Sequence, residues 1–325
     1  MDVKIDDVAK RAGVSKTTVS RVLNNRGYIS EKTRKKVHDA IRELHYSPNA
    51  VARQLFKKKT KIVGLIFPTV ANPFFGELVA ELEKDLFKAG FKVFLGDSMN
   101  DPQKEKMYLD ELIANQVDGL IVGTQNENLD EYDVNDLSIV AIDKIINEEI
   151  PVISSDNYQG GLIATQTLIE RGARNIILTD GPLSIKSPAH KRREAYEAAM
   201  KQHGLKPEVF LIDFSWSTGE KVAAIKKMLV EHPNIDAVFA TNDIDAAMIW
   251  QIAEEMGKEI PKDLKIIGYD HAQTTGFLLP KLTSIKQPIE EMATAAVKAL
   301  LGRMKHKSVD KKQVFPVKLW PGESI

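Results

Sequence analysis

Polar and aromatic side chains recur in this sequence directly after short apolar runs of the kind that form buried β-strands. They are Asn72, Phe74 and Phe75 after IVGLIFP, Asp143 and Lys144 after IVAI, Asn242 and Asp243 after AVFAT, and Asp270 after IIGY. Carboxylates and amides form paired hydrogen bonds with sugar hydroxyls, and aromatic rings stack on the C–H faces of a sugar ring. Each residue alone also fits a structural role, such as capping a turn or filling the core.

The elements that must position these residues are nine apolar runs that alternate with amphipathic helical segments from residue 62 onwards. The runs are IVGLIFP, KVFLGDS, DGLIVGT, IVAID, PVISSD, NIILTDGP, VFLIDF, AVFATND and KIIGYD. This alternation predicts an α/β fold with parallel sheets. Nine runs exceed one ordinary sheet, so we expect two doubly wound lobes with a ligand between the carboxyl ends of their strands.

Motifs for catalysis, nucleotides and metals are missing from the same region. The sequence has no cysteine, and it lacks GxGxxG, GxxxxGK[ST] and HExxH. GPLSIKS is too weak a match to a nucleophile elbow to count. Because no nucleophile–base pair or metal set can be assembled, we expect a binding protein without a cofactor rather than an enzyme.

Charge divides the chain into a basic N-terminal segment and an acidic remainder. Residues 1–59 hold 15 Lys and Arg against 6 Asp and Glu, which leaves 30 against 39 in residues 60–325. A basic segment of this size predicts a polyanionic partner, because each cation placed near a phosphate releases counterions. A merely solvated charged surface is the alternative.

Three short helices are expected in the basic segment. Apolar residues at helical spacing predict a first helix that stops at Gly13, a second from Lys16 to Leu23 capped by Ser15, and a third capped by Ser30. This pattern is a helix-turn-helix, whose second helix enters the major groove of DNA. The free face of that helix carries Lys16, Thr17, Ser20 and Arg21, which suit guanine edges and thymine methyls.

Residues 46–59, YSPNAVARQLFKKK, follow with a proline that ends the third helix and with Asn49 as the N-cap of another short helix. A helix of about two turns is marginal in water, so we expect it to fold on binding.

The runs IDDVAKRAGVSKTTVSRVLNNRGYISEKTRKKV and YSPNAVARQL resemble the headpiece of the lactose and purine repressor family. The resemblance implies a homodimer that reads palindromic operator DNA, with Leu55 of each subunit wedged into the minor groove. A linker residue packed on the core is the alternative for Leu55. The DNA-binding residues implied are Lys16, Thr17, Ser20, Arg21, Asn24, Asn49, Ala52 and Leu55.

The rest of the chain resembles the core of the same family and the periplasmic sugar-binding proteins, through ANPFF, AIDK, SSDNYQGG, HKRREAY, FATND, IIGYDHA and LTSIKQP. The effector-binding residues implied are Asn72, Phe74, Phe75, Asp143, Lys144, Arg192, Phe214, Asn242, Asp270 and Gln287. Lys144 departs from the ribose-binding proteins, which place Arg there, and a lysine lacks the planar fork of the guanidinium. Arg192 also fits a surface ion pair on its helix.

The expected organisation is a headpiece at 1–45, a hinge at 46–59 and a periplasmic-binding-protein-like core at 60–325. Within the core, 60–157 and 287–325 form the N-lobe and 158–286 the C-lobe, with three crossings between them. The N-terminus has three aspartates and no apolar signal region, and no apolar stretch reaches membrane-spanning length. We therefore expect a cytoplasmic protein without a membrane partner.

The leading hypothesis is a repressor of a sugar-utilisation operon, with ribose as the first choice of effector and sucrose or another sugar as the second. Whether the sugar is an inducer or a co-repressor stays open. The alternative in the same family is a catabolite-control regulator that responds to a phosphorylated partner protein. An exported solute-binding protein is disfavoured by the basic headpiece.

Overall fold

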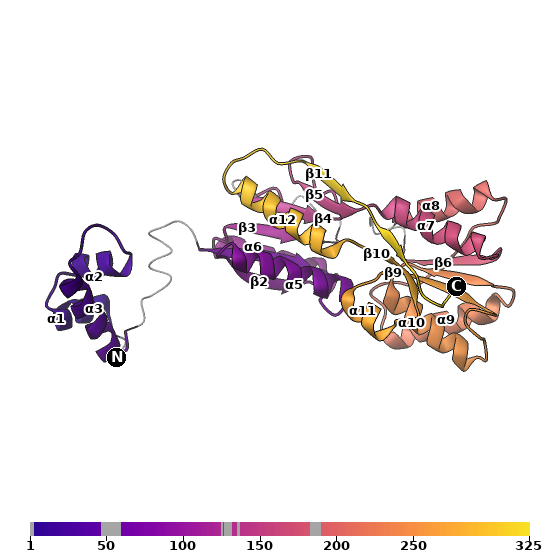
Figure 1. Cartoon of the computed structure of the whole chain (residues 1–325), viewed down its shortest axis with the longest axis horizontal. Helices are drawn as coiled ribbons and strands as arrows, with labels where there is room; N and C mark the ends of the chain where they lie inside the picture. The colour runs from indigo at the N-terminus through magenta and orange to yellow at the C-terminus, as the bar shows by residue number, and fades with distance from the viewer. Residues whose placement is uncertain (1–2, 47–59, 125, 127–131, 135–136, 183–189) are drawn as a thin grey trace. The chain divides into compact units, whose positions relative to one another are not determined.

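The computed structural model describes residues 3–46, 60–124, 126, 132–134, 137–182 and 190–325, and it divides into two compact units, Met1–Thr60 and Lys61–Ile325 (Figure 1). The hinge expected at 46–59 lies outside the described residues except for Tyr46. The division into units falls at residue 60, close to the start of the expected core.

The first unit is a three-helix domain, as expected. Its helices are α1 (Ile5–Ala12), α2 (Lys16–Leu23) and α3 (Glu31–Glu43). Gly13 ends α1 in the left-handed conformation, at a φ of 66°, and the Ser15 and Ser30 hydroxyls accept backbone N–H groups of α2 and α3. Val8, Val19 and Val37 are fully buried where the three helices meet. The local caps and the apolar stripes together fix this fold.

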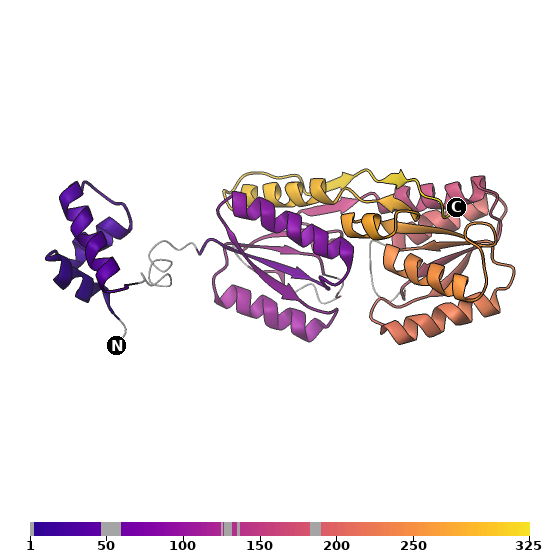
Figure 2. The ribbon, with the colours of Figure 1, turned by 60° about the horizontal axis from the view of Figure 1, so that its bottom comes forward.

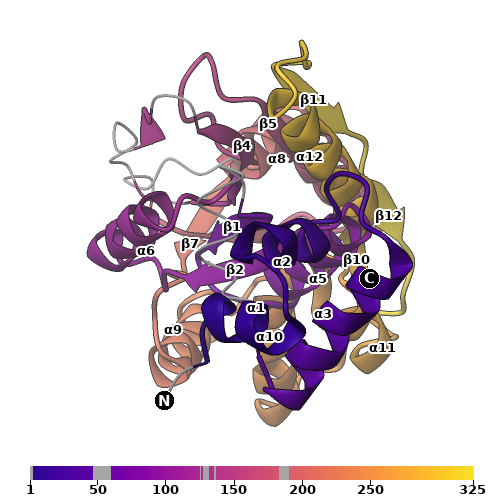
Figure 3. The same cartoon turned by 90° about the vertical axis from the view of Figure 1, so that its left-hand side faces the viewer.

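The second unit contains two six-stranded sheets, each the centre of one lobe (Figure 2). The first sheet has the order β11-β5-β4-β3-β1-β2 and is parallel throughout. Its strands are β1 (Ile62–Phe67), β2 (Lys92–Asp97), β3 (Gly119–Val122), β4 (Ser138–Ile142), β5 (Val152–Ser155) and β11 (Lys312–Phe315). Helix α6 (Pro102–Ala114) packs on one face, and α5 (Pro73–Lys88) and α12 (Ile289–Arg303) pack on the other (Figure 3).

The second sheet has the order β12-β10-β9-β8-β6-β7. Its strands are β6 (Ile176–Asp180), β7 (Glu208–Leu211), β8 (Ala237–Ala240), β9 (Lys265–Asp270), β10 (Thr283–Lys286) and β12 (Lys318–Trp320). The helices of this lobe are α7 (Asn157–Glu170), α8 (His190–Gln202), α9 (Thr218–Glu231), α10 (Asp243–Glu255) and α11 (Gln273–Leu278). All nine apolar runs form strands, so the expected two-lobed α/β core is confirmed.

The chain passes between the lobes three times, after β5, after β10 and after β11. Two of these crossings are tied together, because the Asp156 amide donates to the Phe315 carbonyl at 2.8 Å. The last crossing differs from the boundary expected at 287–325. Strand β12 pairs antiparallel with β10 in the second sheet, and the Ser324 hydroxyl donates to the Ile266 carbonyl at 2.6 Å. Residues from about 317 onwards therefore belong to the second lobe. The sequence did not indicate this, because β12 has only three residues and is too short to show the alternation of buried and exposed side chains typical of a strand.

None of the described helices is long and apolar enough to cross a membrane.

Candidate functional site

A cavity of about 140 Å³ lies between the lobes, at the carboxyl ends of the strands of both sheets. Every effector-binding residue expected from the sequence lines it: Asn72, Phe74, Phe75, Asp143, Lys144, Arg192, Phe214, Asn242, Asp270 and Gln287. Because strand ends converge at this edge of each sheet, residues far apart in the sequence meet on one cavity wall.

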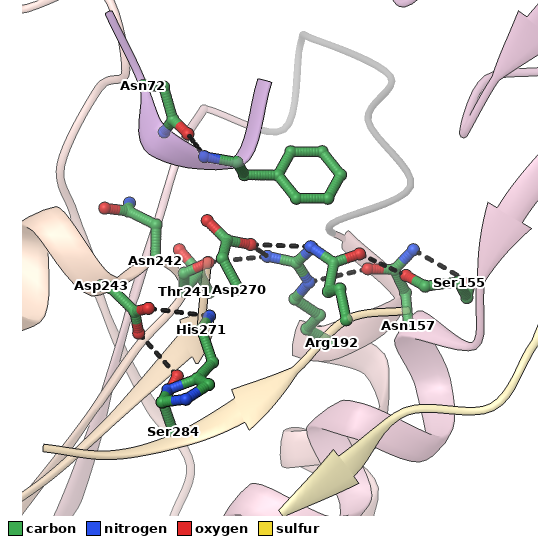
Figure 4. A network of polar contacts seen from close by, with 12 residues as sticks. Asn72, Ser155, Asn157, Arg192, Thr241, Asn242, Asp243, Asp270, His271 and Ser284 are labelled. Atoms are coloured by element: carbon green, nitrogen blue, oxygen red, sulfur yellow. Dashed lines mark hydrogen bonds and ion pairs between the residues drawn. The ribbon is translucent and has the colours of Figure 1, made fainter. Parts of the chain in front are cut away.

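Arg192, near the start of α8, is the centre of the polar network in the cleft (Figure 4). Its Nε donates to the Asn157 side-chain carbonyl at 2.7 Å, and a terminal nitrogen donates to the Thr241 backbone carbonyl at 2.6 Å. The same terminal nitrogen lies 3.9 Å from Asp270, and the guanidinium lies 3.5 Å above the centre of the Tyr269 ring. Arg192 is buried, so its expected alternative as a surface pair is not what the structure contains.

Two adjacent glycines in SSDNYQGG allow Arg192 to reach this position. A Cβ on Gly161 would lie 2.4 Å from the backbone carbonyl oxygen of Arg192, and one on Gly160 would lie 2.2 Å from the Tyr269 hydroxyl. Helix α8 and the Tyr269 ring therefore pack against α7 at distances that only glycine permits. This motif therefore sets the close approach of α8 to α7 and with it the position of the guanidinium.

Gln287 joins the strand ends of the two lobes. Its amide nitrogen donates to Asp270 at 2.7 Å, and its amide oxygen accepts from the Ser155 hydroxyl at 2.6 Å. Ser155 ends β5 of the first sheet and Asp270 ends β9 of the second, and all three side chains are buried. A rotation of one lobe against the other must therefore disturb this chain of hydrogen bonds.

Asp143 and Asp270 face Arg192 from opposite lobes. Burial raises the pKa of Asp143 to about 6 and the pKa of Asp270 to about 8, although the Arg192 charge acts against both increases. Asp143 has a left-handed φ of 62° at the end of β4, and its Oδ1 is buried without a hydrogen-bond partner among the described residues.

Lys144 is buried beside Asp143, and its ammonium donates to the backbone carbonyl of Asn126. The Asn126 side chain and the Tyr132 hydroxyl both donate to the buried carboxylate of Glu105 on α6. Lys144 thus belongs to a network of the first lobe, rather than taking the place of a guanidinium fork in the cleft.

Aromatic rings form the apolar part of the cleft. Phe74 and Phe75 lie in the first turn of α5 and contact each other edge to face at 5.2 Å between ring centres. Phe214, in the loop after β7, lines the cavity from the second lobe with Lys221 5.7 Å above its ring. These rings supply flat apolar surfaces that suit the C–H faces of a sugar.

Two of the expected amides also cap helices. The Asn72 side-chain oxygen accepts the Phe74 amide at 2.9 Å at the start of α5. Asn242 accepts the Asp245 amide at 2.8 Å and donates to the Asp245 carboxylate at 2.7 Å at the start of α10. Capping uses part of the hydrogen-bonding capacity of both side chains, and their remaining N–H groups are available to a ligand.

Asp243, a candidate from its place after a strand, does not line the cavity. It is a buried acceptor for the Ser284 and Thr275 hydroxyls and for the His271 amide, at 2.6 to 2.9 Å. Its carboxylate thereby holds the loop after β9 and the start of β10 against α10. Burial raises the pKa of Asp243 to about 6.

Sequence reasoning missed several residues of the cavity wall: Asn157, Asp180, His190, Asp213 and Thr241. Asp180 and Thr241 lie at the ends of apolar runs, so the strand-end rule could have identified them. His190 begins α8 and lies 3.2 Å from Asp180. Among the described residues, no group of His, Asp or Glu is arranged to hold a metal ion.

The residues expected to read DNA lie on or beside α2. Lys16, Thr17 and Arg21 are exposed, while Ser20 is half-buried. Lys16 forms an ion pair with Asp6 at 3.1 Å, and Asn24 caps the end of α2 by donating to the Ser20 carbonyl at 2.9 Å. The other expected DNA contacts, Asn49, Ala52 and Leu55, lie outside the described residues.

Comparisons with known proteins cover both units. Residues 4–49 match the family model "Bacterial regulatory proteins, lacI family", and residues 60–315 match "Periplasmic binding proteins and sugar binding domain of LacI family". The chain is 43% identical to a sucrose operon repressor of Pediococcus pentosaceus, over 99% of both chains. It is 38% identical to the ribose operon repressor of Bacillus subtilis, over 93% of this chain and 91% of the relative.

Solved structures of LacI-family proteins are similar to this chain as well. The Lac repressor dimer bound to operator and the anti-inducer ONPF superposes with a TM-score of 0.86 and 28% identity, over 100% of this chain and 99% of the other. A LacI family regulator from Enterococcus faecium with bound ribose has a TM-score of 0.72 and 28% identity, over 81% of this chain and 98% of the other.

Proposed function

Because this chain belongs to the LacI family of bacterial regulatory proteins, we propose that it represses a sugar-utilisation operon under the control of a small sugar. The observation that carries the proposal is the cleft between the lobes, where hydroxyl-binding groups and aromatic rings converge in a chain that also has a DNA-reading headpiece. The relatives are repressors and not enzymes, and binding alone is the mechanism.

The sugar binds between the lobes and joins them. Asn72 and Asp143 reach it from the first lobe, and Arg192, Asn242 and Asp270 from the second, while Phe74, Phe75 and Phe214 stack on its faces. Ribose and sucrose are the first sugars to test, since repressors of both operons are among the relatives. Closure of the lobes on the sugar acts on the Gln287 hydrogen bonds and shifts the core between two states.

The DNA partner is a palindromic operator read by a homodimer in the cytoplasm. Lys16, Thr17 and Arg21 of α2 contact base edges, and Ser20 and Asn24 lie beside them. In the second unit, Phe277 and Leu278 of α11 are 84% and 67% exposed, and a second subunit would cover such apolar surface. Asn49, Ala52 and Leu55 complete the contacts at the operator centre.

The test begins with selection of a preferred sequence from random double-stranded DNA by the full chain. Arg21→Ala should weaken binding to the selected sequence by about 1–3 kcal/mol and leave random-sequence binding nearly unchanged. Arg26→Ala, which removes an exposed charge just beyond α2, is the matched control and should affect both DNAs equally. Fluorescence anisotropy measures both affinities, and equal losses for Arg21→Ala would assign this residue to phosphate contact.

The same assay with sugars tests the sensor. Ribose or sucrose should change the affinity for the selected sequence, and the sign of the change assigns the sugar as inducer or co-repressor. If no sugar changes operator affinity or raises the melting temperature, the sugar proposal fails, and a phosphorylated partner protein becomes the effector to test.

A further inference from the structure

The cations in the cleft wall already donate to protein groups. Arg192 donates to Asn157 and to the Thr241 carbonyl, and it stacks on Tyr269. Lys144 donates to the Asn126 carbonyl. These contacts use two of the five guanidinium N–H donors and at least one of the three ammonium donors, so protein acceptors already take up part of the binding capacity of both cations.

By contrast, one buried acceptor of the cleft wall remains open. The Oδ1 atom of Asp143 is buried and has no hydrogen-bond partner among the described residues. A buried carboxylate oxygen without a donor is costly, and a bound ligand can supply the donor that removes this cost. A sugar hydroxyl, which can donate a hydrogen bond, fits this requirement.

Charges around the cavity provide no net attraction for an anion. Its described wall holds the carboxylates of Asp143, Asp180, Asp213, Asp245 and Asp270, against the cations Lys144 and Arg192 and the titratable His190. Asp245 is paired with Lys221 at 2.9 Å, and Asp180 with His190 at 3.2 Å. Because burial raises the pKa of Asp270 to about 8, the two carboxylates left at pH 7, Asp143 and Asp213, match the two permanent cations in number.

Two helix N-termini at this cleft, a kind of site that binds phosphate in many α/β proteins, are already occupied by protein groups. Helix α5 starts with Pro73, which has no N–H, and the next amide donates to Asn72. Helix α10 carries Asp243 and Asp245 in its first turn and is capped by Asn242. A phosphate would meet carboxylates at the start of α10, and at the start of α5 it would meet a proline and an amide that already donates to Asn72.

We infer that the cleft selects an unphosphorylated sugar and that Asp143 is a specificity-determining residue that rejects phosphorylated ones. This inference rests on the proposed function and names the ligand class of that site. A phosphate ester carries a charge of about −1.5 to −2 at pH 7 and is mainly an acceptor, so it leaves the Asp143 carboxylate unsatisfied and adds like-charge repulsion.

The test is calorimetry on the full chain with ribose, ribose 5-phosphate, sucrose and sucrose 6-phosphate. At least one free sugar should bind, and its phosphorylated form should bind roughly 100-fold more weakly, as expected when a charged hydrogen bond is replaced by repulsion. Asp143→Asn should weaken binding of the free sugar by roughly 10-fold. The ratio of the affinities for the free and the phosphorylated sugar should then fall to within about 10-fold.

Asp143→Asn should fold, because it removes an unsatisfied buried charge and because Asn tolerates the left-handed backbone at this position. Asp101→Asn is the matched control: it changes an exposed aspartate that caps α6, and Asn caps equally well, so both affinities should stay unchanged.

The outcomes separate the inference from the proposed function. A phosphorylated sugar that binds the wild-type chain as tightly as its free form refutes the inference and leaves the sugar-repressor proposal intact. Unchanged discrimination in Asp143→Asn also refutes it, because another group must then reject the phosphate. If none of the four compounds binds, the proposed function fails and the inference fails with it.

Discussion

Replacing Arg192 by lysine should weaken sugar binding while the chain stays folded. A lysine keeps the charge, but its ammonium cannot bond Asn157 and the Thr241 carbonyl in the geometry of the guanidinium fork, at 2.7 and 2.6 Å. Loss of one charge-assisted hydrogen bond costs about 1.5–3 kcal/mol. Because Asn157 and Asp270 then lose their fixed positions, we expect sugar affinity to fall by about 10- to 100-fold.

Calorimetry gives the affinity, and thermal unfolding of the same samples gives the stability. Arg193→Lys is the matched control on the adjacent position of α8. Arg193 pairs with Glu197 at 2.8 Å near the surface, a contact worth only about 0.3–0.5 kcal/mol, so sugar affinity should not change. Unaltered sugar affinity in Arg192→Lys would show that the guanidinium is not what organises the cleft.

Two further predictions concern packing and protonation. Gly161→Ala should destabilise the chain by about 1–3 kcal/mol and weaken sugar binding, because the new Cβ would lie 2.4 Å from the Arg192 carbonyl oxygen. Gly219→Ala, whose Cβ would have nothing within 4 Å, is the control and should leave both the stability and the sugar affinity unchanged. Equal melting temperatures for the two variants would contradict the prediction. The pKa is raised to about 8 for Asp270 and to about 6 for Asp143. The folded chain therefore binds more protons than the unfolded chain between about pH 4 and 8. As a result, the free energy of unfolding should fall as the pH rises through this range. Sugar hydroxyls that donate to these carboxylates lower both pKa values, so sugar affinity should rise with pH from about 6 to 8. The protons released on binding are detectable by calorimetry in buffers of different ionisation enthalpy. A sugar affinity that falls over this pH range would contradict the role of Asp143 and Asp270 as acceptors for the sugar.

Local signals predicted the parts of the fold that depend on neighbours in sequence. Gly13, Ser15 and Ser30 mark helix boundaries through their own backbone and side-chain chemistry, and these boundaries were correct. The cavity wall followed from the strand-end rule, because parallel strands bring their carboxyl ends to one edge whatever the loops between them.

The parts that could not be predicted depend on distant contacts. Asp243 and Asp270 both follow strands, yet only the packing of α10 against β9 and β10 decides that the first accepts Ser284 inside the lobe and the second faces the cleft. Strand β12 adds only three residues to the edge of the second sheet, so the sequence shows no alternating pattern that would predict its pairing with β10. The partners of Arg192 come from three separate segments, which no local pattern connects.

The three crossings between the lobes have a consequence for synthesis. The core of the first lobe contains Ile289, Met292 and Leu300 of α12, and β11 forms one edge of its sheet, yet both elements follow most of the second lobe in the chain. At about 5–20 residues per second, the roughly 130 residues between β5 and α12 take on the order of 10 s to leave a ribosome. During that interval the first lobe has five strands, but one face of its sheet is covered by α5 without α12. Strands β6 to β10 of the second lobe emerge in one stretch before α12 and β11 complete the first lobe, and β12, which pairs with β10 in the second sheet, emerges last.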